Sequence, residues 1–100
     1  LNFFNTFPYN VGLLLDVAHL KVSSKTLNFN LNKSHESLKK HISAYHLSDN
    51  NSVVDSNRLI NKKSWFIKNL KKNLEYYTIE VYSNDLNILK QQIKFVKNYI

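Results

Sequence analysis

The sequence predicts an α/β fold built on a parallel β-sheet, and two observations support this prediction. Short, nearly continuous apolar segments alternate with segments whose apolar residues recur at helical spacing. The resulting strand-helix unit repeats about every 33 residues, a spacing typical of parallel strands joined by right-handed crossovers. With 43% hydrophobic residues, the chain has enough apolar side chains for a packed core.

Three strands are expected. Residues 11–17 (VGLLLDV) form an apolar run that suits a strand buried on both faces and ending at Asp16. Residues 42–47 (ISAYHL) form a second candidate, which ends near His46 and Asp49. Residues 76–82 (YYTIEVY) are β-branched and aromatic, with Glu80 near the end, and give the clearest strand signal.

The intervening segments predict three helices and one long loop. Asn32 or Ser34 can cap a helix that runs to about residue 40, and polar residues 48–63 predict a loop. Ser64 can cap a helix over residues 65–74. A last helix starts at Asp85 and places one apolar stripe on its surface, formed by Leu86, Leu89, Ile93, Val96 and Ile100.

Two known architectures share this order of elements. A doubly wound sheet would usually carry a glycine-rich phosphate loop after its first strand, and the chain has a single Gly. An eight-unit barrel allots roughly 31 residues per unit. Three strands cannot close a barrel, and the chain contains no Met. We therefore expect residues 1–100 to be the C-terminal three βα units of a single (β/α)8 TIM-barrel domain whose upstream part is missing.

Composition excludes several classes of function. The chain has no Cys, which rules out disulfides and thiolate metal ligands and fits a reducing, cytoplasmic location. No apolar run approaches the roughly 20 residues that span a bilayer, so no membrane partner is expected. The net charge is +7, but Arg58 is the sole Arg, and this scarcity argues against nucleic-acid binding. Biased codon usage or a polyanion-binding face would each explain the lysines.

Polar side chains gather at the carboxyl ends of the predicted strands. Asp16, His19, His46, Asp49 and Glu80 each fall at or just beyond such an end, and these ends face one side of a parallel sheet. Asp, His and Glu together supply the oxygen and nitrogen donors used by Mn, Co, Mg and Zn sites. The sequence therefore predicts a divalent-metal site in which a carboxylate can also transfer a proton.

Each of these residues also has a structural alternative. Asp16 could cap a loop, His46 could be a hydrogen-bonded core histidine, and Glu80 could pair with a Lys. His35 and His41 lie on the polar crossover helix and are expected to face solvent. The aromatic residues, including Trp65 and Phe66, are expected only to pack.

The strand-end motifs resemble a known superfamily. They are Leu15-Asp16-Val17-Ala18-His19, Tyr45-His46-Leu47-Ser48-Asp49-Asn50, Asp55-Ser56-Asn57-Arg58 and Tyr77-Thr78-Ile79-Glu80-Val81. In order and spacing, from about residue 11 to the end, they are similar to the C-terminal half of the xylose-isomerase-like TIM barrels. This superfamily includes sugar and sugar-phosphate isomerases and epimerases, and the barrel-type apurinic endonucleases.

In the isomerase and epimerase branch, the resemblance implies a metal-dependent enzyme of carbohydrate metabolism. One divalent ion is held by a Glu, an Asp, a His and a second Glu; Asp16, His46 and Glu80 match the last three, and the first Glu would lie upstream. Glu80 would be half of a catalytic acid-base pair. His19 would contact a sugar or sugar-phosphate substrate, and Arg58 could meet its hydroxyl or phosphate. A homo-oligomer is compatible with this branch, and the 100 residues alone are expected to be inactive.

In the endonuclease branch, the resemblance implies three zinc ions and an Asp-x-His motif in the loop. Here the motif is Asp55-Ser56-Asn57, and neutral Asn is a poor replacement for a zinc-binding imidazole. A zinc-dependent phosphodiesterase is therefore the second hypothesis. A barrel that keeps the fold and binds a ligand without catalysis is the third.

Overall fold

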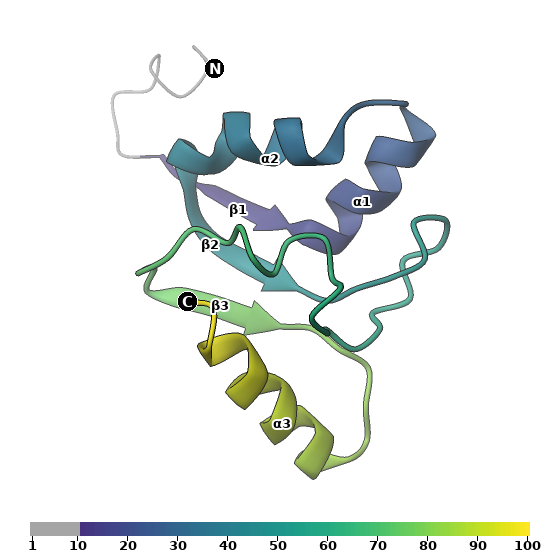
Figure 1. Ribbon diagram of the computed structural model, residues 1–100, viewed down its shortest axis with the longest axis vertical. Coiled ribbons are helices and arrows are strands. Elements are labelled where there is room, and N and C mark those ends of the chain that lie inside the picture. The colour runs from purple at the N-terminus through teal and green to yellow at the C-terminus, as the bar shows by residue number, and fades with distance from the viewer. Residues whose placement is uncertain (1–10) are drawn as a thin grey trace.

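The computed structural model describes residues 11–100 (Figure 1); residues 1–10 of the predicted domain lie outside this part. A three-stranded sheet is combined with three α-helices and a short 3-10 helix in this region. In chain order the elements are β1 (Leu13–Asp16), α1 (Val17–Thr26), α2 (Leu31–Leu38), η2 (Lys39–His41), β2 (Ile42–Leu47), β3 (Tyr76–Ile79) and α3 (Leu86–Lys97). The predicted α/β class is confirmed.

The sheet is parallel throughout and has the strand order β1-β2-β3, so all three arrows in Figure 1 point the same way. Each predicted strand forms, but the first and third are shorter than expected. β1 ends at Asp16, because this residue is also the N-cap of α1. β3 ends at Ile79, although the N–H of Glu80 still donates to the carbonyl of Leu47 at 2.8 Å.

A local irregularity sets the register that brings the strand ends together. Leu13 pairs with Ile42, but Leu14 pairs with Ala44, so β2 contains one extra residue, Ser43. Beside it lies Gly12, where an added Cβ would come within 1.8 Å of the Ser43 hydroxyl oxygen. A glycine is therefore required for this close approach.

The first crossover contains two helices, of which one was predicted. α1 begins directly after Asp16, whose side chain accepts hydrogen bonds from the N–H groups of Ala18 and His19. Val and Ser residues give α1 little helical pattern, which is why the sequence does not reveal it. α2 is capped by Asn30, earlier than the expected Asn32 or Ser34.

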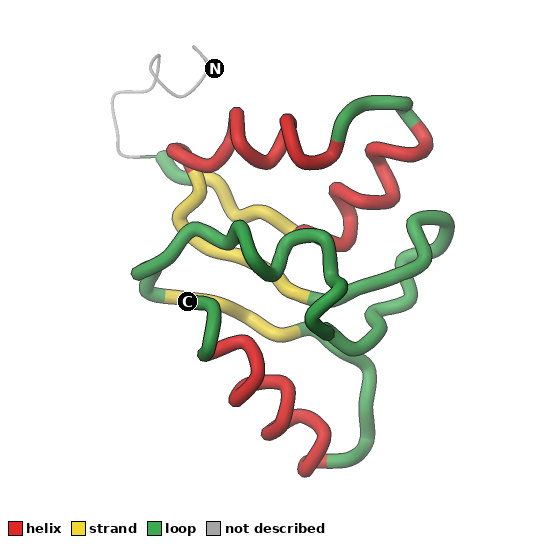
Figure 2. Tube along the Cα trace, viewed as in Figure 1, coloured by secondary structure: helices red, strands yellow, loops and turns green. Residues whose placement is uncertain are grey.

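The predicted helix over residues 65–74 is wrong: Figure 2 draws this segment as loop. Its hydrogen bonds span three residues, as in Ile67 N–H to Ser64 and Asn69 N–H to Phe66. The Ser64 hydroxyl donates to Asp49 instead of capping a helix. Phe66, Ile67 and Leu70 are all buried, so these turns pack against the core without forming a helix.

The core lies on one face of the sheet. Leu15, Tyr45 and Leu47 point into it, and Phe66 of the crossover and Val96 of α3 pack with them. α3 starts after Asp85 as predicted, with the Asp85 side chain as its N-cap. On the opposite face Leu14 and Tyr76 are largely exposed. None of the helices between residues 11 and 100 is long and apolar enough to cross a membrane.

Candidate metal centre

Asp16, His46 and Glu80 meet at the carboxyl end of the sheet. Each offers one donor atom, and these three atoms all lie within 4.8 Å of one another. Asp16 is the last residue of β1, His46 is the penultimate residue of β2, and Glu80 directly follows β3. Their side chains are 20%, 32% and 36% exposed, so the group is accessible from solvent. The parallel strands thus bring together residues 30 or more positions apart.

Asp16 has two tasks in this arrangement. Its Oδ1 accepts from the backbone N–H of Ala18 at 3.0 Å and of His19 at 2.9 Å, which caps α1. Its Oδ2 lies 3.4 Å from Nδ1 of His19. Asp16 therefore caps a helix, where the structural alternative was the cap of a loop, and the same carboxylate also lies in the cluster of three donor atoms.

His46 and Glu80 contact each other directly. Nδ1 of His46 lies 2.7 Å from Oε1 of Glu80, which is hydrogen-bond distance. Glu80 thus pairs with a histidine, and not with the lysine considered as its structural alternative. His46 is part-exposed and so differs from a histidine enclosed in the core. An imidazole nitrogen and a carboxylate oxygen are thus in contact at the carboxyl end of the sheet.

His19 lies beside the cluster, paired with a loop carboxylate. Its Nε2 is 2.5 Å from Oδ2 of Asp55, and its side chain is 63% exposed. With Asp16 on one side of the ring and Asp55 on the other, His19 is held between two acidic residues. The predicted substrate-binding residue is thus adjacent to the predicted metal ligands.

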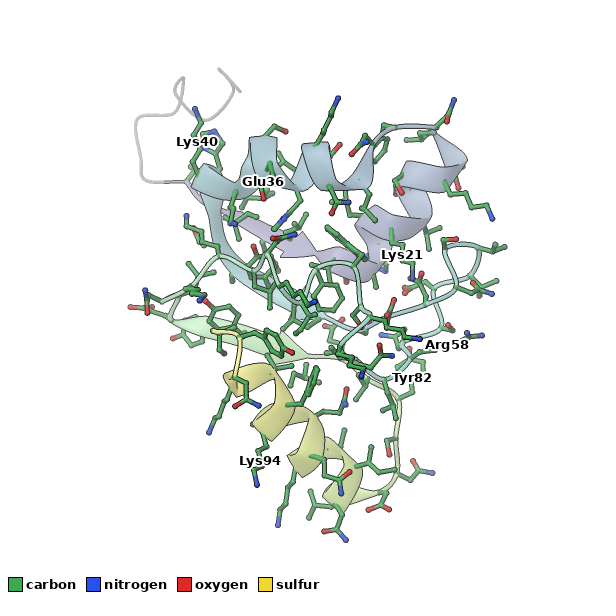
Figure 3. All side chains as sticks on the ribbon, in the orientation of Figure 1. Lys21, Glu36, Lys40, Arg58, Tyr82 and Lys94 are labelled. Atoms are coloured by element: carbon green, nitrogen blue, oxygen red, sulfur yellow. The ribbon has the colours of Figure 1, made fainter. Side chains whose placement is uncertain are left out.

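Arg58 is exposed and lies in the loop that follows β2. Its backbone forms a two-bond bridge with Asp49, with N–H to O distances of 2.7 and 3.0 Å. Figure 3 shows Arg58, Lys21 and Tyr82 on the side toward which the strands point, while Lys40 lies at the opposite end of the sheet. Arg58 therefore shares the candidate site's end of the molecule without joining the cluster of three.

Asp49 does not join the cluster, contrary to the expectation that the strand-end residues converge. Its Oδ1 accepts from Lys21 Nζ at 2.8 Å and its Oδ2 from the Ser64 hydroxyl at 2.8 Å. The side chain is only 13% exposed. Both carboxylate oxygens are used to anchor loops, and therefore Asp49 has a structural role here.

Asn57 is a site residue whose contacts the sequence did not predict. Its side-chain Nδ2 donates to the backbone carbonyl of Glu80 at 2.7 Å. The amide at the position where the endonuclease pattern needs a histidine is therefore engaged with the protein backbone. The only signal in the sequence was the departure from Asp-x-His.

A second polar group lies on the covered face of the sheet and corrects the prediction for His35. This residue is 1% exposed, its Nε2 is 2.8 Å from the Tyr45 hydroxyl, and its ring makes a T-shaped contact with Trp65. Burial, followed by the charge of Lys39, lowers the pKa of His35. His41, also expected to face solvent, is half-buried. Polar neighbours on α2 suggested exposure, but the crossover loop covers this helix face.

Comparisons of the chain with protein-family models, with curated proteins and with solved structures found no match.

Proposed function

We propose that Asp16, His46 and Glu80 bind one divalent metal ion, in a metal-dependent isomerase or epimerase that acts on a sugar or sugar phosphate. One observation carries the proposal: three donor atoms from three different strand ends lie within 4.8 Å of one another. Exposed acidic groups often gather without an ion, but here a histidine completes the group and each residue comes from a separate element. The fold proposed for the whole protein is the (β/α)8 barrel, and residues 1–100 would form its last three βα units.

The donor set suits Mn, Co, Mg or Zn. Two carboxylates and one imidazole provide hard oxygen and borderline nitrogen ligands, and the chain has no thiol that would favour a softer ion. The three ligands of this chain and the upstream glutamate would occupy four positions, so a six-coordinate ion keeps positions for substrate oxygens. When bound, a divalent ion polarises neighbouring oxygens of a sugar and so eases loss of a proton from the carbon beside its carbonyl.

The residues of this chain would then have separate tasks. Glu80 would accept or return the proton, because its carboxylate is part-exposed and belongs to the group. His19 would orient a substrate hydroxyl, since Asp55 at 2.5 Å fixes its ring. Arg58 would attract a phosphate from the same end of the sheet. The second glutamate of the acid-base pair would come from another unit of the barrel, and the protein would work in the cytoplasm.

The contacts of Asn57 favour this proposal over a three-zinc phosphodiesterase. A third zinc ion would need an imidazole at that position, and the amide present donates to the Glu80 carbonyl. The contact of Asn57 therefore favours a centre with one metal ion.

Titration calorimetry of the chain with Mn²⁺, Co²⁺ and Zn²⁺ tests the metal centre. We expect one ion per chain, and loss of at least about tenfold in affinity in Glu80→Gln, because a ligand is removed. Glu75→Gln is the matched control, since Glu75 directly precedes β3 and Glu80 directly follows it. Absence of binding, or equal binding by the two variants, contradicts the proposed centre. Turnover is tested on the full-length protein by solvent deuterium incorporation into sugars and sugar phosphates, which Glu80→Gln should abolish.

A further inference from the structure

The backbone around Glu80 is bonded to β2 and to the loop that follows it: the N–H of Glu80 donates to the carbonyl of Leu47, and Asn57 of the loop makes two further bonds. Nδ2 of Asn57 donates to the carbonyl of Glu80 at 2.7 Å, and the carbonyl of Asn57 accepts from the N–H of Tyr82 at 2.9 Å. Glu80 lies just beyond the end of β3, where the regular ladder stops. Asn57 therefore continues, beyond the end of β2, the hydrogen bonding that β2 provides to β3.

The backbone conformation of Asn57 makes this double contact feasible. Its φ is 49°, in the left-handed region, which asparagine tolerates better than most residues other than glycine. Both its side-chain amide and its own carbonyl bond to the Glu80–Tyr82 segment. An asparagine is thus suited to this position by its backbone preference and by its amide donor together.

The loop that carries Asn57 is itself fixed to the sheet. The neighbouring Arg58 forms the two-bond backbone bridge with Asp49. The Asp49 carboxylate is anchored by Lys21 of α1 and by Ser64 of the following crossover. Because Asn57 is attached to a frame of several elements, it can restrain Glu80 and does not simply move with it.

We propose that Asn57 is a positioning residue that holds Glu80 at the metal centre; this inference rests on the proposed function. The carboxylate of Glu80 is 2.7 Å from His46, and the three donor atoms fit within 4.8 Å. A small rotation of the backbone at Glu80 would carry its carboxylate away from the other two ligands. Groups that orient a ligand in this way commonly change metal affinity about 10- to 100-fold when removed.

Two substitutions remove the amide donor while keeping the left-handed backbone accessible. Asn57→Gly deletes the side chain, and Asn57→Asp keeps its shape but places an acceptor opposite the Glu80 carbonyl. Asn73→Gly is the matched control, because Asn73 also has a left-handed backbone, with φ of 63°, but lies just before the start of β3, whereas Asn57 bonds to the segment that follows the end of β3. We expect metal affinity to fall at least about tenfold in both Asn57 variants, and to change less than about twofold in Asn73→Gly.

Unfolding by urea shows whether the variants fold, and metal affinity separates positioning from stability alone. Wild-type affinity in a folded Asn57→Gly variant overturns the positioning role and leaves the metal centre intact. Absence of binding by the unsubstituted chain overturns the proposed function, and the positioning role with it. NMR of the unsubstituted chain gives a test independent of variants: Zn²⁺ should shift the side-chain amide signals of Asn57, and unchanged signals would refute the coupling.

Discussion

On the covered face of the sheet Tyr45 has no exposed surface, whereas on the opposite face Tyr76 keeps 67% of its own exposed. The two tyrosines belong to adjacent, paired strands: Tyr76 pairs with Ala44, which directly precedes Tyr45. Successive residues of a strand point to opposite faces, so the two rings lie on different sides of the same small sheet. His35 contacts the first face, and His46 lies on the second.

The polar groups on the two faces are satisfied in different ways. The Tyr45 hydroxyl accepts from the N–H of Lys71 and bonds to His35, and burial raises its pKa. These bonds of the Tyr45 hydroxyl connect the crossover loop to the sheet, and they give a buried polar atom the hydrogen-bond partners that it needs. On the open face, the side chains of His46 and Glu80 contact each other and remain accessible. The polar residues that stabilise the fold thus lie on one face of the sheet, and those that are available to a ligand lie on the other.

The largest expected effect tests the difference between the faces with one substitution at each tyrosine. Tyr45→Ala should lower the free energy of unfolding by about 3–5 kcal/mol, because it empties a buried aromatic site. Tyr76→Ala should change it by less than about 1 kcal/mol, since its ring is mostly solvated. Urea unfolding followed by far-UV circular dichroism measures both, and failure of Tyr45→Ala to fold agrees with the expectation. Similar losses at the two positions would show that both faces are packed.

The second effect concerns pH and the covered face. The pKa of His35 is lowered in the folded chain, whereas in the unfolded chain this histidine binds a proton with its ordinary pKa of 6.5. The unfolded state therefore binds more protons below that pH, and this group contributes no pH dependence above it. The free energy of unfolding should fall as pH drops through 6.5, with a slope of at most about 1.4 kcal/mol per pH unit from this group. The fall should stop once pH is below the lowered pKa.

His35→Gln supplies the comparison for that pH dependence. Glutamine offers an oxygen to the Tyr45 hydroxyl but does not titrate. Urea unfolding of both proteins between pH 5 and pH 7.5, at constant salt, gives the two slopes. We expect a shallower acid slope in the variant, and identical slopes would remove His35 as the source.

Strand positions could be predicted from the sequence because their apolar, β-branched runs are local signals. β2 was predicted with its bounds, and the convergence of Asp16, His46 and Glu80 followed from the parallel order alone. The crossover over residues 65–74 could not be predicted, because its turns depend on contacts with Tyr45 and Asp49. Sequence periodicity there matched a helix that tertiary packing overrides.

The contacts around the site were harder to predict than its ligands. Asn57 reaches Glu80 across 23 residues, and Lys21 reaches Asp49 across 28. Such pairs depend on where a loop returns to the sheet, and neither composition nor spacing encodes that path. His35 was misplaced for the same reason, since Trp65 and Tyr45 enclose it only in the folded chain. Whether the three units belong to a barrel stays a prediction.

The smallest expected effect separates the two tasks of Asp16 on the open face. Asp16→Ala removes the N-cap of α1 and should lower the free energy of unfolding by about 1 kcal/mol, whereas Asp16→Asn keeps a capping oxygen and should change it by less than about 0.5 kcal/mol. Both should weaken metal binding, because neither keeps the carboxylate. Asp85→Ala is the control: it removes the N-cap of α3, where the side chain accepts from the N–H of Asn87 and is not one of the three ligands, and should cost similar stability while metal affinity is unchanged. If Asp16→Asn destabilises as much as Asp16→Ala, the charge itself is what the helix needs, and the cap and the ligand cannot be separated at this residue.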